Sequence, residues 1–204
     1  MNNKGCFGIG TIGLVILLIV AAIGIWAFSA YNGLVAGNNE VQKKWANVES
    51  VYQKRANLIP NLANTVKAYA KHEQETLTKV IEARANATSV KIDPTNMTEA
   101  DMAKFQAAQG ELSGALSKLM MVVESYPNLK ADQQFIDFQR EYTAVENSLR
   151  TETVNYNDSV EKFNNSAQQL PGSLLVAFFP KFAAKPVFKA EAGAQKAPEV
   201  FKEE

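Results

Sequence analysis

The sequence predicts an all-α protein with an N-terminal transmembrane helix followed by an antiparallel, up-and-down bundle of three to four long helices. Three observations lead to this prediction. The chain opens with an uncharged apolar segment, apolar residues then recur every three or four positions, and the segments between the periodic runs are short and contain Pro, Asp and Asn. Short connections place consecutive helices side by side and antiparallel.

The apolar segment at residues 7–28 contains no charged side chain. A helix needs about 20 such residues to cross the hydrocarbon core of a bilayer, whereas the apolar core of a signal peptide has roughly 7–15. Trp26, Phe28 and Tyr31 gather at its end, where aromatic rings favour the headgroup boundary. We therefore predict that residues 1–30 form an uncleaved, single-pass anchor that contacts lipid through residues 7–28. A cleaved signal peptide is the alternative.

The few basic residues near the anchor indicate its orientation. Lys4 precedes the apolar segment, and the next basic residue, Lys43, comes well after it. Because basic flanks tend to stay in the cytoplasm, we predict a protein of the cytoplasmic (inner) membrane whose bundle lies outside the cytoplasm.

The first bundle helix is expected to run from near Asn32 or Asn39 to about Thr88. Pro60 lies inside this range, removes one backbone hydrogen bond and crowds the carbonyl of Ala56. Because the apolar phase continues through the proline, we predict a single helix that is kinked at Pro60. The apolar positions of this helix are Val41, Trp45, Val48, Tyr52, Ile59, Leu62, Val66, Tyr69, Leu77, Val80 and Ile81.

The second bundle helix has a clear start signal. Asp93-Pro94 within residues 91–98 is turn chemistry, and Thr98 followed by Asp101 resembles a capping box. The helix should end near Tyr126, since the following proline disfavours helical backbone in the residue before it. Its inward positions are Met102, Phe105, Leu112, Leu116, Leu119 and Val123.

The third bundle helix is expected after a short turn, with Asp132 as its N-cap, and should end at Pro171-Gly172. Its inward positions are Phe135, Phe138, Tyr142, Val145, Leu149, Tyr156, Val160, Phe163 and Leu170.

The C-terminal part of the chain changes character. Residues 173–188 are apolar but are interrupted by Pro180 and Pro186, so the segment is too short and broken to cross a bilayer. It either packs back on the bundle as a short fourth helix, which we favour, or lies at the lipid interface. Residues 191–204 are polar and are predicted to form a loosely ordered tail, which leaves residues 31–190 as the bundle domain.

Several short motifs resemble those of the LemA family. They begin just after the anchor and continue nearly to the C-terminus: YNGLV (31–35), W-x-x-V-x-x-x-Y-x-x-R (45–55), NLIPNL (57–62), VKAYAKHE (66–73), EARA (82–85), ESYPNLKA (124–131), FIDFQ (135–139), ENSLR (146–150), NYND (155–158) and the closing KPVFKAEAGAQKAPEV. The resemblance implies a bacterial, single-pass membrane protein with a helical, bundle-like domain. It implies no particular reaction.

The composition offers little for catalysis. Lys and Arg number 21, as do Asp and Glu, so the zero net charge gives no reason to expect a nucleic-acid partner. One cysteine and one histidine exclude a thiolate metal cage and leave carboxylates as the only plentiful ligands. The Glu-x-x-His motif of di-iron carboxylate bundles does not occur. We therefore expect no catalytic residue, no metal, no cofactor and no small-molecule substrate.

Charged residues interrupt the apolar positions of the predicted bundle at Arg55, Glu73 and Glu152. A buried charge must be paired, so we expect Arg55 or Lys54 to lie near an acid on the second or third bundle helix and to set the register of the bundle. The candidates for such register-setting or partner-facing roles are Lys54, Arg55, Asn57, Pro60, Asn61, His72, Glu73, Arg84, Tyr126 and Pro127.

Together these observations favour a membrane-anchored, non-catalytic interaction or scaffold module of the bacterial cell envelope. Its partner would be another envelope protein or a second copy of the chain. The alternative is an enzyme, or a receptor for phosphate or another ligand, that uses charged residues of the bundle.

Overall fold

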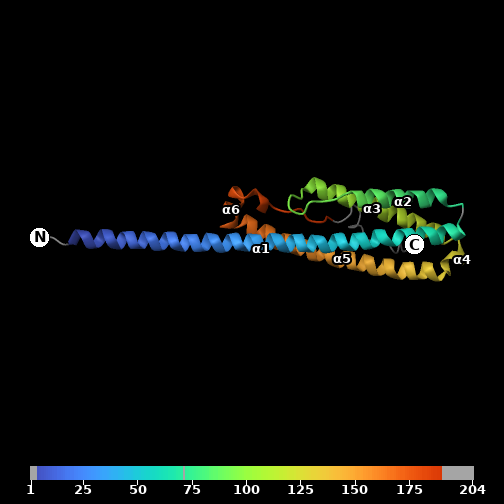
Figure 1. The fold of residues 1–204 in the computed structure, drawn as a ribbon, viewed down its shortest axis with the longest axis horizontal. Helices are drawn as coiled ribbons and strands as arrows, with labels where there is room; N and C mark the ends of the chain where they lie inside the picture. Colours follow the sequence, from blue (N-terminus) through green and yellow to red (C-terminus); the bar gives the residue numbers. More distant parts are fainter. Residues whose placement is uncertain (1–3, 71, 190–204) are drawn as a thin grey trace, which may run out of the picture.

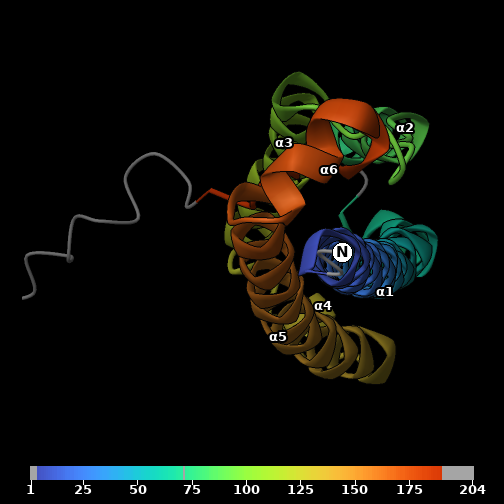
Figure 2. The same cartoon turned by 90° about the vertical axis from the view of Figure 1, so that its left-hand side faces the viewer.

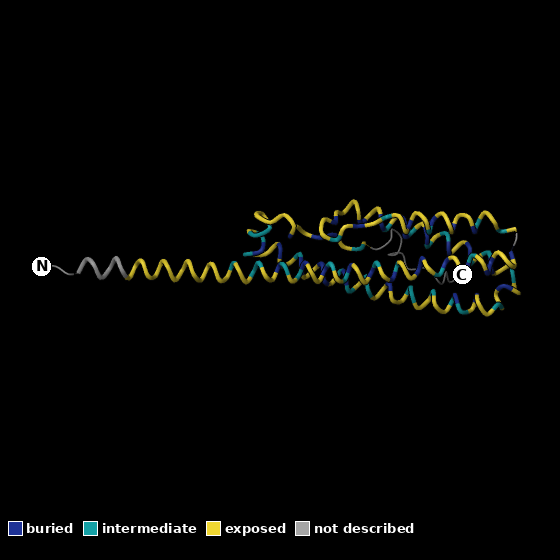
Figure 3. Tube along the Cα trace, viewed as in Figure 1, coloured by how far each residue is buried: buried dark blue, intermediate teal, exposed yellow. Residues whose placement is uncertain are grey.

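The computed structural model describes residues 4–70 and 72–189, with side chains from residue 11 onward, and the predicted tail at residues 191–204 lies outside them. One helix dominates the molecule. Helix α1 covers Lys4–Tyr69, 66 residues, which corresponds to about 100 Å at 1.5 Å per residue. Its first part stands free of the bundle and is exposed (Figures 1 and 3). By length and composition, this apolar part is able to cross a membrane.

Helix α1 differs from the expected first bundle helix at both ends. It includes the anchor without a break, and it ends at Tyr69 instead of near Thr88. The chain reverses between the end of α1 and the start of the next helix, so that α2 (Gln74–Ser89) runs back along α1 (Figure 1). The reversal buries Leu77 and Val80 against the rest of the bundle, whereas a straight continuation would carry them past its end. Helix α1 stays continuous across Pro60.

The remaining helices follow the predicted order. Helix α3 (Glu99–Val123) starts with the capping box of Thr98 and Asp101, which is confirmed. A short helix α4 (Pro127–Lys130) occupies part of the predicted turn, and α5 (Gln133–Gln168) is capped by Asp132 as predicted. Helix α1 packs mainly against α5, and α2 packs mainly against α3. The up-and-down bundle on an apolar N-terminal helix is therefore confirmed.

The interior consists of two apolar cores along the bundle. The distal core, far from the N-terminus, joins α1, α2, α3 and α5 and contains Ile59, Leu62, Val66, Leu77, Leu112, Leu116, Leu119, Phe135 and Phe138. The proximal core lies nearer the point where α1 leaves the bundle and contains Leu34, Val41, Trp45, Val48, Met102, Phe105, Tyr156, Val160, Phe163 and Phe182. Most predicted inward positions are buried, but Tyr69, Ile81 and Leu170 are exposed, against expectation.

The C-terminal segment packs on the bundle in part. After α6 (Gly172–Phe178) and a 3₁₀ turn, η1 (Pro180–Phe182), residues 183–189 form an extended strap over the proximal core. Asn157 and Asn164, seven residues apart on α5, each bond both the N–H and the C=O of one strap residue, Phe188 and Lys185 respectively, at 2.8–3.1 Å. The two amides therefore hold the strap much as a neighbouring strand would.

The half-buried Tyr142 and the fully buried Tyr156 predict how the fold responds to alkali. Burial and the nearby Glu146 raise the pKa of Tyr142 to about 12, and burial raises the pKa of Tyr156. An unfolded tyrosine ionises near pH 10, so the stability tied to these phenols is fully present below about pH 10 and is lost as pH rises through the folded pKa values. We expect both to ionise only as helix content falls, in a titration that follows tyrosinate absorbance and circular dichroism together. Complete ionisation in one step near pH 10 with helices intact would contradict this.

Candidate functional site

A buried arginine connects three helices between the two cores. Arg55 is 2% exposed. Its Nη2 donates to the carbonyl of Gln109 at 2.9 Å and to the hydroxyl of Ser113 at 2.8 Å, both on α3. Its Nη1 pairs with the carboxylate of Glu146 on α5 at 3.3 Å. The side chain of Gln109 in turn donates to the carbonyl of Ala87 at the end of α2, at 3.3 Å. All four long helices of the bundle thus meet in one polar layer.

A second arginine donates a hydrogen bond to the backbone carbonyl that Pro60 leaves without its helical donor. Pro60 has no N–H, so it cannot bond the carbonyl of Ala56 four residues earlier. The Nε of Arg84 on α2 donates to that carbonyl at 2.8 Å. Ala56 is buried, and a buried carbonyl without a partner would be unfavourable. The proline therefore creates an acceptor on α1 that Arg84 uses to hold α2 in place.

A double-mutant cycle tests this link. Arg84→Ala is expected to lower the free energy of unfolding by about 1–3 kcal/mol, because it leaves the Ala56 carbonyl unsatisfied. Pro60→Ala restores the backbone donor, so the same arginine change should cost well under half as much in that background. Urea unfolding of the full chain in detergent micelles measures both. Lys79→Ala, which removes an exposed ion pair on the same helix, is the control and should change little. Equal costs of Arg84→Ala in the two backgrounds would show that the link is absent.

Two tyrosine–carboxylate bonds close the distal tip of the bundle. The hydroxyl of Tyr126 donates to Glu73 at 3.0 Å, and that of Tyr69 donates to Asp132 at 2.8 Å. The first joins the α1–α2 reversal to the α3–α4 turn, and the second joins the end of α1 to the start of α5. The bond from Tyr69 lowers the pKa of Asp132, and the bond to Glu73 raises that of Tyr126.

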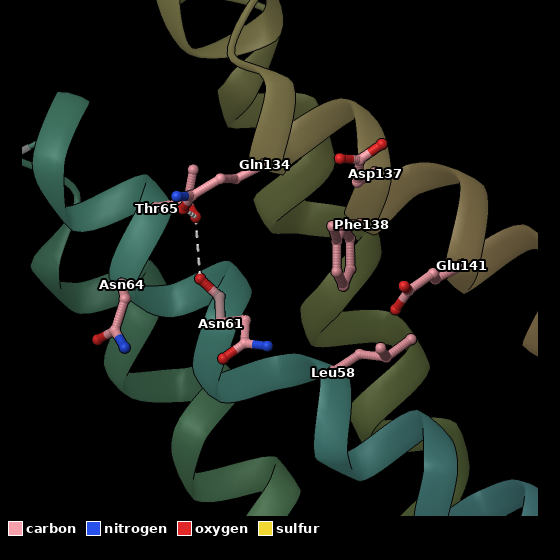
Figure 4. A pocket seen from close by; sticks show the side chains of 8 residues that line it. All are labelled: Leu58, Asn61, Asn64, Thr65, Gln134, Asp137, Phe138 and Glu141. Carbon is pink, nitrogen blue, oxygen red and sulfur yellow. Dashed lines mark hydrogen bonds between the residues drawn. The ribbon is translucent and has the colours of Figure 1, made fainter.

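An open groove of about 400 Å³ lies between α1 and α5 in the distal half of the bundle. Figure 4 shows Leu58 and Asn61 of α1 opposite Phe138 and Glu141 of α5. The full lining consists of Leu58, Asn61, Asn64, Thr65, Gln134, Asp137, Phe138 and Glu141. Within it Thr65 is hydrogen-bonded to the carbonyl of Asn61 and to Gln134. The groove thus combines an apolar floor with amide and carboxylate groups.

The polar groups of the groove are available to a binding partner. No group among the described residues forms a hydrogen bond with the side-chain amides of Asn61 and Asn64 or with the carboxylate of Glu141, and all three residues are exposed. Asp137 is occupied only by exposed neighbours on its own helix. Asp137 pairs with Arg140 at 3.1 Å, so Glu141 supplies the uncompensated negative charge of the groove. It is therefore suited to polar or basic ligand groups and unsuited to a phosphate.

The predicted site residues occupy three different places. Arg55 and Arg84 make interior bonds, Glu73 and Tyr126 bond at the distal tip, and Asn61 lines the groove. The other five are exposed and are not brought together: Lys54, Asn57, Pro60, His72 and Pro127. Asn57 accepts a bond from Gln53 on its own helix. Partner-facing or register-setting roles for all ten stay predictions.

The α5 side of the groove was not among the residues predicted from the sequence. Asp137 and Glu141 are four residues apart, a spacing that places two side chains on one face of a helix, and Phe138 lies between them. The spacing was the available signal, but the partner helix of that face was not known. Glu152, expected among the apolar positions, is half-buried and accepts a bond from Asn47 at 3.2 Å.

The fold and the groove define a class of protein: an all-α bundle carried on an N-terminal helix that is able to span a membrane. Within that class the chain belongs to the LemA family, whose model matches residues 44–201. This confirms the resemblance noted in the short motifs.

Curated relatives agree with this assignment. The chain is similar to "Protein LemA" of Metamycoplasma hominis, with 26% identity over 153 residues that cover 74% of this chain and 66% of that protein, just under two thirds of its length. It is also similar to two Paramagnetospirillum magneticum proteins, magnetosome proteins MamQ 1 and MamQ 2, each with 24% identity over 195 residues that cover 85% of this chain and 71% of the relative.

Proposed function

We propose that this protein is a non-catalytic interaction module of the bacterial cell envelope, anchored in the cytoplasmic membrane by residues 7–28, with the bundle outside the cytoplasm. The observation that carries the proposal is the groove at Asn61 on a long continuous helix. Asn61 lies 33 residues after Phe28, where the apolar segment ends, which corresponds to about 50 Å along α1 at 1.5 Å per residue. Such a helix presents a binding surface well above the bilayer.

The groove favours a protein segment as its ligand. Leu58 and Phe138 offer apolar contact, the amides of Asn61 and Asn64 are able to bond a peptide backbone, and Glu141 suits a lysine or arginine. An anionic ligand would meet the carboxylate of Glu141, which pairs with no cation among the described residues, and that of Asp137, which pairs with Arg140 at 3.1 Å. We therefore favour an envelope protein with an exposed basic segment over the receptor for phosphate.

Site-specific photo-crosslinking in native membranes tests the proposal. A photoreactive residue placed at Asn61 or at Glu141 should form an adduct with one partner protein, whereas the same residue at Lys118, an exposed position on α3, should not. The acidic double variant Asp137→Asn with Glu141→Gln should weaken the adduct formed from position 61. Glu82→Gln, a neutral change at an exposed position on α2, is the matched control and should leave the adduct unchanged.

The outcomes separate the alternatives. An adduct of twice the mass of the chain would identify a second copy as the partner. Equal crosslinking at Asn61 and Lys118 would contradict a role for the groove, and turnover by the purified full chain without a partner would favour an enzyme. Protease added to intact cells whose outer barrier has been opened should degrade the bundle, while a bundle that is fully protected would contradict the proposed orientation.

A further inference from the structure

Helix α6 leaves apolar side chains uncovered at one end of the bundle. Leu174 is 56% exposed and Phe178 79% exposed, and Leu170, just before the helix, is 70% exposed. These three residues, four apart along the chain, form the α6 patch. The surrounding sequence is uncharged from Phe163 to Pro180. An exposed apolar patch of this kind marks a surface that binds another apolar surface.

The α6 patch lies at the end of the bundle that faces the anchor. Figure 1 shows α6 at the end where α1 leaves the bundle, and Figure 2, viewed from the N-terminal side, shows α6 in front and beside α1. The contacts agree with the pictures. The ring of Tyr31 on α1 meets those of Phe179 and Phe182 at 5.3 and 5.5 Å between centroids.

The position of Tyr31 sets the height of α6 above the bilayer. Tyr31 follows the end of the apolar span at Phe28 by three residues, or about 4–5 Å of helix at 1.5 Å per residue. The headgroup layer on each side of the hydrocarbon core is about 5–7 Å thick. When residues 7–28 span the core, the turn after α6 is therefore level with the headgroups. The α6 patch reaches the boundary at which amphipathic segments settle.

The neighbouring lysine fits the same position. Lys181 is exposed and follows the uncharged stretch directly. Its ammonium lies 3.2 Å from the hydroxyl of Tyr31 and 4.9 Å from the ring centroid of Phe182. Lysines at a membrane surface place their stems along apolar groups and their charge among the headgroups. Aromatic rings beside the lysine are also typical of this layer.

We propose that the α6 patch inserts into the interfacial layer of the same bilayer that holds the anchor, as a second membrane contact of the bundle. Leu170, Leu174 and Phe178 enter the boundary of the acyl chains, and Lys181 contacts the headgroups. One helix alone would leave the bundle free to tilt and rotate about the anchor. The second contact fixes which side of the bundle faces the membrane and stabilises its upright position.

Spin labels on the full chain test the proposal. With Cys6→Ser as background, single labels are attached at Phe178→Cys and Leu174→Cys, and the protein is reconstituted into vesicles of phosphatidylcholine. Collisions with oxygen, which concentrates in lipid, are compared with collisions with a water-soluble nickel chelate. Labels at both positions should favour oxygen over the chelate, as a label at Ile19→Cys in the span does. A label at Met121→Cys, 65% exposed on the distal part of α3, should show the reverse.

Every other pattern overturns the proposal. Labels at 174 and 178 that behave as the label at 121 would place the α6 patch in water. Protection of both labels from oxygen and from the chelate would mean that protein covers the patch. A label at 19 that collides with the chelate would mean that the anchor is not inserted. Because these exposed positions bear little on folding, all labelled chains should keep their helix content. The result does not depend on the groove, so failed crosslinking there leaves this inference standing.

Discussion

Replacing Arg55 with alanine is expected to lower the free energy of unfolding by about 3 kcal/mol, the lower end of the range for breaking a buried charge pair. The change leaves the carbonyl of Gln109 and the hydroxyl of Ser113 without their donor inside the bundle. It also opens a cavity where the guanidinium was. The lower end applies because the side chain of Glu146 is 36% exposed, so water is able to hydrate its carboxylate once the arginine is gone.

Two further variants make the Arg55 prediction specific. Lys54→Ala removes an exposed neighbouring charge and should change stability by less than about 0.5 kcal/mol. Glu146→Gln should cost about 1 kcal/mol, because Arg55 keeps its two acceptors on α3. Urea unfolding in detergent micelles, followed by circular dichroism, compares all three. A cost for Arg55→Ala no larger than that for Lys54→Ala would show that the polar layer does not stabilise the bundle.

The register-setting role of Arg55 needs a different substitution. Arg55→Leu fills most of the volume with apolar atoms and is able to keep overall stability, as replacements of buried ion pairs often do. If Arg55 selects the register, the leucine variant should show altered helix pairing or oligomeric state, seen as lost hydrogen-exchange protection in α3 or a changed mass in solution. Unchanged helix pairing and unchanged mass would show that Arg55 does not select the register.

Capping and turn residues in the sequence were sufficient to predict where α3 and α5 begin. The capping box at Thr98, the cap at Asp132 and the turn at Asp93 are made by side chains within three residues of the backbone groups they bond. The reversal between α1 and α2 has no such signal. Neither proline nor glycine marks it, and the apolar spacing continues in phase into α2. The end of α1 follows from the length of the helices that face it. Leu77 and Val80 are buried in the distal core only when the chain turns back at the end of those helices.

The sequence was sufficient to predict that Arg55 has a charged partner, but not which residue that partner is. A charge at an inward position requires a partner, so an acid near Arg55 was expected, and Glu146 on α5 occupies that place. Its identity depends on how far α5 slides along α1, which the turns and the distal tip set. Likewise, Pro60 makes a free carbonyl at Ala56 predictable, yet the donor Arg84 follows from the unforeseen reversal. The groove combines residues that are more than 60 positions apart, which sequence spacing alone does not bring together.

Trp45 is the central side chain of the proximal core. Trp45 is fully buried. Its ring meets Phe105 of α3 at 5.3 Å and Tyr156 of α5 at 5.5 Å in edge-to-face contacts, and it stacks on Phe188 of the strap at 5.9 Å. Such aromatic pairs contribute beyond the area that they bury. No α2 helix covers this half, so the strap and the 91–98 loop close it.

Trp45→Ala is therefore expected to lower the free energy of unfolding by about 3–5 kcal/mol, the range for truncating a large buried aromatic side chain. The strap should loosen first, since Phe188 loses its stacking partner. Its backbone is then held by the side-chain bonds of Asn157, Asn164, Tyr156 and Gln106. Urea unfolding measures the total loss, and hydrogen exchange at residues 183–189 measures the loosening. Trp26→Ala, at a half-exposed position in the anchor, is the matched control and should alter neither quantity. Because the strap covers Trp45 directly, unchanged exchange there in Trp45→Ala would mean that the side-chain hydrogen bonds hold the strap without the tryptophan.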